Sequence, residues 1–226
     1  MMNSTATVEV PPFCFATTNK WEDCKHFCPS PDVVLDCGAN VGQTARNLRQ
    51  AYPAATIYCF EPVGEAYDQL EAAAHELDIL PVQAAVSNET GMQSINLTAS
   101  IESNSLLGYL AESNPLATPH RVIGTERVRV WRLDDWCDAA GVAHKDVNVL
   151  KMDVQGAELM ALSGAPRILS GVQIVLLEVA FLPFYDGCPL FADVESFMTA
   201  HGFHRVAIYA SVMSEIWADA LYVRSR

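Results

Sequence analysis

Along most of the chain, segments with two different patterns of hydrophobic and polar residues follow one another. Short apolar runs of strand length are followed by longer stretches in which apolar residues recur every three or four positions. The predicted strands cover residues 33–37, 56–60, 80–86, 92–97, 127–133, 147–153, 172–178, 205–210 and 216–223. The predicted helices cover residues 45–51, 64–77, 134–140, 157–169 and 191–201. Strands that alternate with helices predict an α/β fold on a mostly parallel sheet, with the last two strands paired antiparallel.

The same pattern divides the chain into segments. Residues 1–31 show no sustained period, and we interpret them as an N-terminal extension before a single domain over residues 32–226. Residues 98–124 are the least regular part of that domain, with Ser, Asn, Pro and Gly scattered through them. Because an irregular stretch of this length in a compact domain is usually functional or disordered, this segment is a candidate lid over a substrate.

The chain is strongly acidic, with a formal net charge of −13 over its 226 residues. Nucleic-acid affinity depends largely on Lys and Arg side chains that neutralise phosphates, so this charge argues against a nucleic-acid partner. No apolar run reaches the roughly 18 residues of a membrane helix, and residues 1–10 lack the pattern of a secretion signal. We therefore expect no membrane partner and a cytoplasmic location, while homo-oligomerisation stays open.

Seven cysteines, an odd number, fit free thiols in a reducing compartment. The densest group is Cys14, Cys24, His26 and Cys28, whose side chains are of the types that bind zinc. Their spacing matches no compact zinc motif. We therefore favour incidental cysteines and predict no metal site, and the role of this region stays open.

The first candidate binding site is the turn after the first predicted strand. In open α/β sheets, ligands bind beyond the carboxyl ends of the strands. Gly38 and Gly42 stand in this turn, after Asp36, and residues without side chains let the main chain approach a ligand closely. Such a turn serves nucleotide-type cofactors in general, and a purely structural turn is the alternative. It differs from the Gly-x-Gly-x-x-Gly pattern that binds a pyrophosphate.

Glu61 ends the second predicted strand, where an acidic side chain accepts hydrogen bonds from both hydroxyls of a ribose. NAD and S-adenosylmethionine share this adenosine half. Short-chain dehydrogenases need a Tyr followed four positions later by Lys, and none of the seven tyrosines meets that condition. Together with the missing pyrophosphate pattern, this favours S-adenosylmethionine over NAD.

A third candidate site lies at the end of the strand predicted over residues 147–153. Alternation places Lys151 and Asp153 on one face of this strand, with Asp153 at its end, over the cofactor crevice. Buried charges are costly unless partners or a ligand satisfy them, so the pair either belongs to the site or is a structural ion pair. Glu158 follows in the first turn of the next helix, where it suits the helix dipole, and we interpret it as structural.

Four segments together resemble the FkbM family of S-adenosylmethionine-dependent methyltransferases, namely residues 36–42, 60–62, 151–158 and 177–179. The resemblance covers roughly residue 32 to the C-terminus. It implies a Rossmann-like class I methyltransferase fold of the α/β class, whose seven-stranded, mostly parallel sheet has an antiparallel last strand and helices on both faces. It also implies that residues 38–42 hold the methionine moiety of the cofactor, that Glu61 binds the ribose and that residues 85–87 border the adenine.

The cofactor is therefore expected to be S-adenosylmethionine, held by residues at the ends of several strands. The expected cofactor-binding residues are Asp36, Gly38, Ala39, Asn40, Gly42, Gln43, Glu61, Pro62, Ala85, Val86 and Asp153.

The resemblance also implies methyl transfer to a hydroxyl, on a sugar or a secondary metabolite. Such a transfer needs a base for the hydroxyl proton, and the catalytic candidates are Asp153 first and Glu178 second. Tyr185, Asp186 and His120 are further candidates to face this small-molecule acceptor. The alternatives are a non-catalytic protein that binds S-adenosylmethionine or a nucleotide and, with less support, an NAD-dependent oxidoreductase.

Gln155 departs from the family pattern, which commonly has Glu at this position. A missing carboxylate would matter if it normally served catalysis or metal binding. Because Gln155 stands at a predicted helix start, we expect it to cap that helix.

Overall fold

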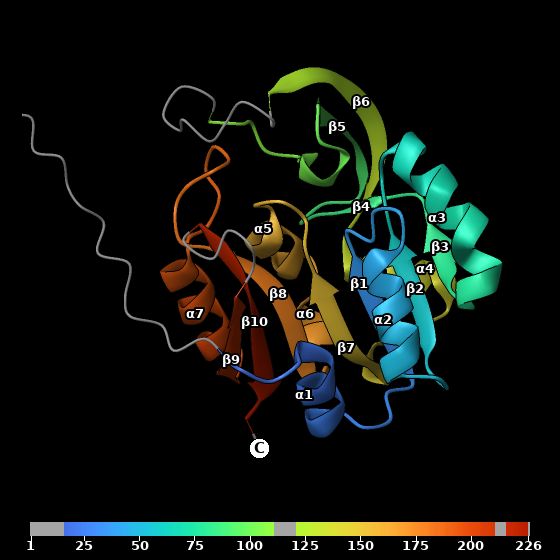
Figure 1. Ribbon diagram of the computed structural model, residues 1–226, viewed down its shortest axis with the longest axis vertical. Helices are drawn as coiled ribbons and strands as arrows, with labels where there is room; N and C mark the ends of the chain where they lie inside the picture. The colour runs from blue at the N-terminus through green and yellow to red at the C-terminus, as the bar shows by residue number, and fades with distance from the viewer. Residues whose placement is uncertain (1–15, 111–120, 211–215, 226) are drawn as a thin grey trace, which may run out of the picture.

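The main sheet of the molecule has seven strands in the order β3-β2-β1-β7-β8-β10-β9 (Figure 1). The computed structural model describes residues 16–110, 121–210 and 216–225. The strands of this sheet are β1 (Val33–Cys37), β2 (Thr56–Phe60), β3 (Leu80–Val82), β7 (Val147–Met152), β8 (Ile174–Ala180), β9 (Phe203–Ala210) and β10 (Trp217–Arg224). β10 runs antiparallel to both of its neighbours, and the other six strands run parallel to one another. The predicted sheet with an antiparallel last strand is confirmed.

Helices cover both faces of this sheet, as predicted. One face carries α1 (Lys20–Phe27), α2 (Gln43–Ala51) and α3 (Gly64–Leu77). The other face carries α4 (Leu133–Ala140), α5 (Glu158–Ser163), α6 (Pro166–Leu169) and α7 (Phe191–Ala200). Every residue of β1 and β7 is buried, and these central strands are mostly apolar rather than alternating, with Asp36, Asn148 and Lys151 as their buried polar residues.

A second, three-stranded sheet lies beyond the carboxyl ends of the main strands (Figure 1). It consists of β4 (Ala85–Val86), β6 (Val122–Trp131) and β5 (Gly91–Thr98) in that order. The prediction of one strand over residues 80–86 is therefore wrong. The N–H of Ala84 donates to the carbonyl of Val82 at 2.9 Å, and this tight turn sends the chain from β3 in one sheet to β4 in the other.

The irregular segment expected over residues 98–124 is shorter than predicted. β6 begins at Val122, because Val122 pairs with Thr98 on β5. Its first positions are exposed, so the alternation that marks a half-buried strand is weak there. A 3₁₀ turn over Ile101–Ser103 interrupts the segment as well. His120 lies outside the described residues.

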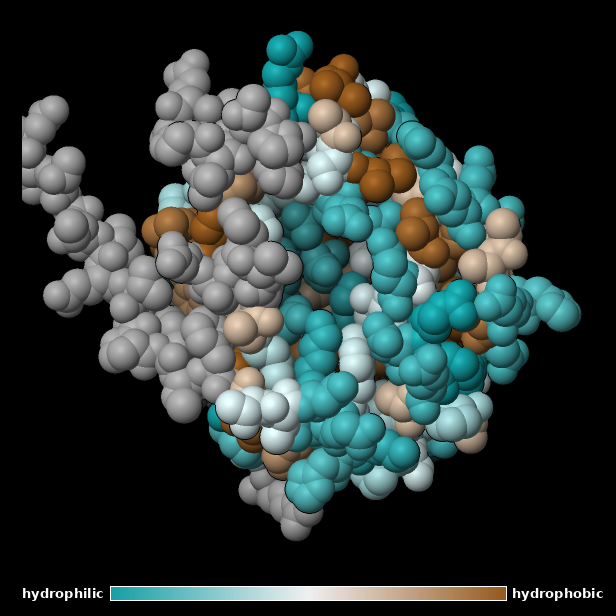
Figure 2. All heavy atoms as spheres, viewed as in Figure 1, coloured by the Kyte–Doolittle hydropathy of each residue, from teal (hydrophilic) through white to brown (hydrophobic). Residues whose placement is uncertain are grey.

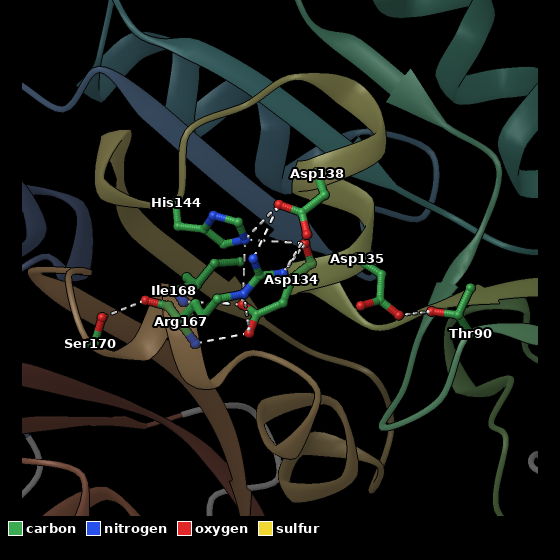
Figure 3. Close-up of polar contacts among 8 residues, drawn as sticks. All are labelled: Thr90, Asp134, Asp135, Asp138, His144, Arg167, Ile168 and Ser170. Atoms are coloured by element: carbon green, nitrogen blue, oxygen red, sulfur yellow. Dashed lines mark hydrogen bonds and ion pairs between the residues drawn. The ribbon is translucent and has the colours of Figure 1, made fainter.

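The single helix predicted over residues 157–169 is also wrong, because the structure divides it into α5 and α6. Pro166 stands at the first turn of α6, where a residue without an N–H is tolerated. Both oxygens of the Asp134 carboxylate accept backbone N–H groups of α6, from Arg167 at 2.9 Å and from Ile168 at 3.1 Å (Figure 3). A side chain from α4 therefore caps α6, and this contact is invisible to local sequence patterns.

Helix α1 belongs to the N-terminal segment but packs on the main sheet. Cys24 and Cys28 are buried in the hydrophobic cluster on that side. Burial raises the pKa of the Cys24 thiol to about 12 and that of Cys28 to about 11, which disfavours the thiolate that zinc binds. Cys14 lies outside the described residues. Within the described ranges, no cluster of three metal-ligating side chains occurs, and no helix there is long and apolar enough to cross a membrane.

Candidate functional site

A cavity of about 440 Å³ opens at the carboxyl ends of β1, β2, β7 and β8. Figure 2 shows that this face of the molecule is hollowed near its centre, with hydrophilic residues around the hollow. Most residues predicted for the site line this cavity, namely Gly38, Ala39, Asn40, Gln43, Glu61, Pro62, Ala85, Val86, Asp153 and Glu178. Asp36 and Gly42 do not line the cavity. Asp36 pairs with Lys151, and Gly42 is the N-cap residue of helix α2.

The glycine turn brings the backbone of β1 against that of β7. Gly38 has a φ of +79°, and a Cβ added to it would lie 1.8 Å from the backbone oxygen of Asp153. The N–H groups of Gly38 and Ala39 both donate to the carbonyl of Phe60, at 3.0 and 2.9 Å. Gly42, with a φ of +95°, caps α2 in the left-handed region. Both positions therefore need glycine for the backbone to follow this path.

Glu61 lines the cavity directly after the end of β2. Its carboxylate accepts the N–H of Asn40 at 3.0 Å through Oε2 and that of Val63 at 2.9 Å through Oε1. Burial raises the pKa of Glu61 to about 7, although the two backbone bonds act in the opposite direction. The buried Oδ1 of Asn40 has no hydrogen-bond donor among the described residues. These acceptors beside an open cavity fit a ligand that donates hydroxyl or ammonium groups, as the adenosine and methionine parts of S-adenosylmethionine do.

Lys151 contacts the glycine turn and two carboxylates. Its Nζ lies 3.1 Å from Oδ1 of Asp36 and 3.7 Å from Oδ2 of Asp153, and it donates to the Gly38 carbonyl at 2.9 Å. Burial lowers the pKa of Lys151, but the attraction of Asp36 and Asp153 outweighs burial and keeps the ammonium charged. Asp36 therefore supports the turn rather than facing the cavity, while Asp153 contacts both Lys151 and the cavity.

Asp153 and Glu178 stand on neighbouring strand ends and share one partner. Nε2 of Gln155 donates to Oδ1 of Asp153 at 2.8 Å and lies 3.4 Å from Oε2 of Glu178. The hydroxyl of Tyr185 donates to Oε1 of Gln155 at 2.7 Å. Burial and then repulsion by Asp153 and Glu158 raise the pKa of Glu178 well above its ordinary value. Two carboxylates next to a cavity can accept a proton from a bound ligand.

The expectation that Gln155 caps the following helix is wrong. No side chain of the N-cap residue Ala157 caps α5. Glu158, the first residue of α5, instead holds the turn before the helix, because its Oε1 accepts the N–H of Val154 at 3.0 Å and that of Gly156 at 3.2 Å. This agrees with the structural interpretation of Glu158. Gln155 has a φ of +55°, and this conformation turns its side chain toward the carboxylates rather than toward the helix.

Residues 98–110 are the described part of the candidate lid that lines the cavity. Ser105 Oγ donates to the backbone oxygen of Gln155 at 2.6 Å, and the Tyr185 hydroxyl lies 3.2 Å from the backbone oxygen of Ser103. The N–H of Asp186 donates to the Gly108 carbonyl at 2.7 Å. This segment and the loop after β8 therefore form one cover, hydrogen-bonded to the turn that carries Asp153. Tyr185 lines the cavity, whereas Asp186 serves the cover through its backbone.

Several residues of the site carry no signal in the sequence. Phe184 and Trp217 form an aromatic wall of the cavity, with ring centroids 5.4 Å apart. A smaller cavity of about 130 Å³ lies beside Asp153 and is bounded by Lys20 and Trp21 of α1. The aromatic residues stand in apolar stretches that suit any core. Lys20 and Trp21 lie in a segment without a motif, so only the folded chain brings them to the site.

The strand order, the glycine turn and the acidic residue at the end of β2 define a class I methyltransferase fold. The sequence model of the protein family described as the methyltransferase FkbM domain matches residues 36–205. The chain therefore belongs to the FkbM methyltransferase family, whose methyl donor is S-adenosylmethionine. The resemblance found in the sequence is confirmed, and so is the expected cofactor.

Individual relatives agree with this family. The 2-O-methyltransferase NoeI of Sinorhizobium fredii is 29% identical over 166 residues, which cover 70% of this chain and 67% of that protein. The 31-O-demethyl-FK506 methyltransferase FkbM of Streptomyces tacrolimicus is 29% identical over 203 residues, covering 78% and 74%. Among solved structures, the magnesium protoporphyrin IX methyltransferase of Synechocystis with bound SAM has a TM-score of 0.52 at 14% identity, covering 91% and 75%, which supports the fold.

Proposed function

We propose that this protein transfers the methyl group of S-adenosylmethionine to a hydroxyl of a sugar or a secondary metabolite. The observation that carries this proposal is the placement of Asp153 and Glu178, which line one cavity from neighbouring strand ends, beside the glycine turn. The names of two relatives, a 2-O-methyltransferase and a 31-O-demethyl-FK506 methyltransferase, support oxygen as the acceptor atom. A hexuronic acid methyltransferase of Haloferax volcanii, 25% identical over 154 residues, supports a sugar.

The cofactor site in this proposal follows the geometry of the cavity. Gly38, Ala39 and Asn40, with Gln43 behind them, face the methionine moiety. Glu61 accepts the ribose hydroxyls through the lone pairs that its two backbone bonds leave free. Three apolar residues line the adenine side, namely Pro62, Ala85 and Val86. When bound, S-adenosylmethionine supplies a methyl group on a positively charged sulfur.

The chain itself supplies alignment and a proton acceptor. An acceptor hydroxyl loses its proton as its oxygen attacks the methyl carbon, and the nearest carboxylate takes up that proton. Asp153 is the first candidate, because its side chain is 34% exposed and its charge is balanced by Lys151 at 3.7 Å. Glu178 is the second candidate, since its raised pKa lets it hold a proton once received. The cover of residues 98–110 limits the access of water to the reaction.

The partner in this proposal is a small molecule, in keeping with the acidic charge of the chain. A cytoplasmic location and the absence of a nucleic-acid partner stay predictions. A non-catalytic protein with the same cofactor site is the second candidate, and it predicts binding without turnover.

Calorimetry and a methyl-transfer assay test the proposal together. We expect wild-type protein to bind S-adenosylhomocysteine, and Glu61→Ala to lose about 10- to 100-fold in affinity because charged acceptors of hydrogen bonds are removed. Glu65→Ala, an exposed glutamate on the neighbouring helix, is the matched control and should bind normally. Label from tritiated S-adenosylmethionine should then appear on members of a panel of sugars and hydroxylated metabolites.

Three outcomes contradict the proposal at different points. Binding of NAD in place of S-adenosylhomocysteine would sink the cofactor site. Unchanged affinity of Glu61→Ala would remove the ribose contact. Cofactor binding without label on any hydroxyl compound would favour the non-catalytic candidate.

A further inference from the structure

Gln155 has an unfavourable backbone conformation, and both the nitrogen and the oxygen of its side-chain amide form hydrogen bonds. Its φ of +55° lies in the left-handed region, which residues other than glycine rarely adopt and which tends to occur at functional sites. The next residue, Gly156, has a φ of +90°, and a Cβ there would lie 2.8 Å from Cδ2 of Tyr185. The ring of Tyr185 therefore packs directly against this turn. A glycine at position 155 would relieve the backbone, so the retained side chain points to a role for its carboxamide.

The orientation of that carboxamide follows from its partners. Its nitrogen lies 2.8 Å from an oxygen of Asp153 and 3.4 Å from an oxygen of Glu178, while its oxygen lies 2.7 Å from the Tyr185 hydroxyl. The reverse orientation would place the amide oxygen against two carboxylates, which offer no proton when ionised. Tyr185 therefore sets the direction in which Gln155 presents its N–H groups.

The surroundings of the two carboxylates carry an excess of negative charge. Asp219 of the neighbouring strand β10 pairs directly with Glu178. After burial and Asp153, the charges of Glu158 on α5 and of Asp219 raise the pKa of Glu178 further. The charge of Lys151 on β7 lowers the pKa of Glu178, but this lysine contacts Asp36 at 3.1 Å and Asp153 at 3.7 Å. Asp219 is paired in turn with Lys20 of α1. An additional positive or proton-donating group between Asp153 and Glu178 is needed to hold them close together.

We propose that Gln155 is a positioning residue of the methyl-transfer site, whose carboxamide bridges Asp153 and Glu178 as a neutral donor and is oriented by Tyr185. This inference rests on the proposed function, in which those two carboxylates face the acceptor hydroxyl. The amide stabilises the ionised pair without adding charge, whereas a glutamate at this position would bring a third carboxylate within hydrogen-bond distance of the other two. Tyr185 also contacts Ser103, so the bridge is continuous with the cover over the cavity.

Nuclear magnetic resonance titration of the side-chain carboxyl carbons tests this role without an acceptor. Protein labelled with ¹³C in Asp and Glu carboxyls is titrated as wild type, Gln155→Met, Gln155→Glu and Tyr185→Phe. All four proteins keep a side chain at position 155, so the backbone cost of the positive φ is matched. Gln69→Met, which changes an exposed glutamine on α3, is the control.

The expected result is an ordered series of titration midpoints for the pair. Gln155→Met raises the midpoint by about one pH unit, because a hydrogen bond to the ionised form is lost. Gln155→Glu raises it further, because a like charge is added. Tyr185→Phe raises it by less than Gln155→Met, since the amide stays but loses its orientation. The control variant titrates as wild type.

A purely structural role for Gln155 would lower stability and leave the midpoint of the pair in place, and that result in Gln155→Met overturns the proposal. If Gln155→Met does not fold, Tyr185→Phe decides the question. An unchanged titration midpoint in Tyr185→Phe would show that Tyr185 does not orient the amide, and it would overturn the proposal. Calorimetry with S-adenosylhomocysteine is run on the same samples. Failure of wild-type protein to bind it counts against the proposed function, whereas the midpoints report on the bridge alone.

Discussion

Two clusters of acidic and basic residues in this molecule resemble each other in composition and differ in what they do. The site cluster comprises Asp153, Gln155, Glu178 and Lys151 at the carboxyl ends of β7 and β8. The α4–α6 cluster comprises Asp134, Asp138, His144 and Arg167 on one flank of the sheet (Figure 3). The partners of their carboxylates differ, and this difference separates a cluster that lines a cavity from one that holds two helices together.

In the α4–α6 cluster, protein groups occupy the carboxylate oxygens. Asp134 accepts two backbone N–H groups of α6, and Arg167 contacts Asp138 at 2.6 Å. The hydrogen bond from Arg167 lowers the pKa of Asp138, whereas burial raises the pKa of Glu178 in the site cluster. The site cluster also borders a cavity and includes a residue with positive φ, and neither feature occurs in the α4–α6 cluster as described. A carboxylate such as Glu178, whose pKa is raised by burial beside a cavity, suits proton transfer, whereas carboxylates paired with backbone N–H groups and an arginine suit architecture.

The largest effect should come from breaking the ion pair that supports the site. Lys151→Met leaves Asp36 buried without its cation, and we expect a loss of about 3–5 kcal/mol in the free energy of unfolding. Urea denaturation measures the loss. Arg46→Met removes an exposed pair with Glu76 and should cost less than about 1 kcal/mol. Equal losses for the two variants would show that burial does not separate these pairs.

The next effect concerns the pH dependence of stability. Burial raises the pKa of Glu158 from 4.5, its value in the unfolded chain, to about 7 in the folded protein. The protonated carboxyl therefore contributes fully to the free energy of unfolding below pH 4.5, and this contribution is lost as the pH rises through 7. We expect this carboxyl to lower the free energy of unfolding by about 3 kcal/mol between these values. In Glu158→Gln, the difference between urea denaturation at pH 5 and at pH 8 should shrink by that amount. If the variant and the wild type show the same difference in stability between pH 5 and pH 8, a group other than Glu158 causes the pH dependence.

A smaller effect is expected for the cap in the α4–α6 cluster. Asp134→Ala removes the acceptor of two N–H groups of α6, which should cost about 1–2 kcal/mol of stability. The affinity for S-adenosylhomocysteine should stay at the wild-type value, because Asp134 does not line the cavity. A variant that loses both stability and cofactor affinity would mean that the two clusters are coupled.

The smallest effect belongs to the exposed end of that cluster. Asp138→Asn weakens a solvent-exposed contact with Arg167, and such contacts contribute little in water. Neither the midpoint of urea denaturation nor the affinity for S-adenosylhomocysteine should change measurably. A clear loss of either would contradict the view that this cluster depends on Asp134 alone.

Elements with a strong local pattern could be predicted from the sequence to the residue. The strands at 33–37 and 56–60 and the helix at 64–77 have the predicted bounds. Their apolar residues are contiguous or recur with a helical period, and they are buried for that reason alone. The prediction failed where a distant partner decides the outcome, as at Pro166, where Asp134 caps a new helix, and at Ala85, which pairs with Val130 of β6 in the second sheet.

The candidate site divides in the same way. Gly38, Glu61, Asp153 and Glu178 were predicted because they stand at the ends of strands, and parallel strands bring their carboxyl ends to one edge of a sheet. The sequence drew attention to Gln155 as a departure from the family pattern, but its local position suggested the wrong role.

By itself, the sequence determined the α/β fold, the family and the edge of the sheet at which the candidate site lies, because periodicity and strand-end motifs are local properties. Only the tertiary structure decided which of the polar residues contact one another. Gln155 and Tyr185 are 30 positions apart, and Ser103 is 82 positions from Tyr185. Contacts of this kind depend on distances and directions between side chains of different elements, which no local pattern encodes.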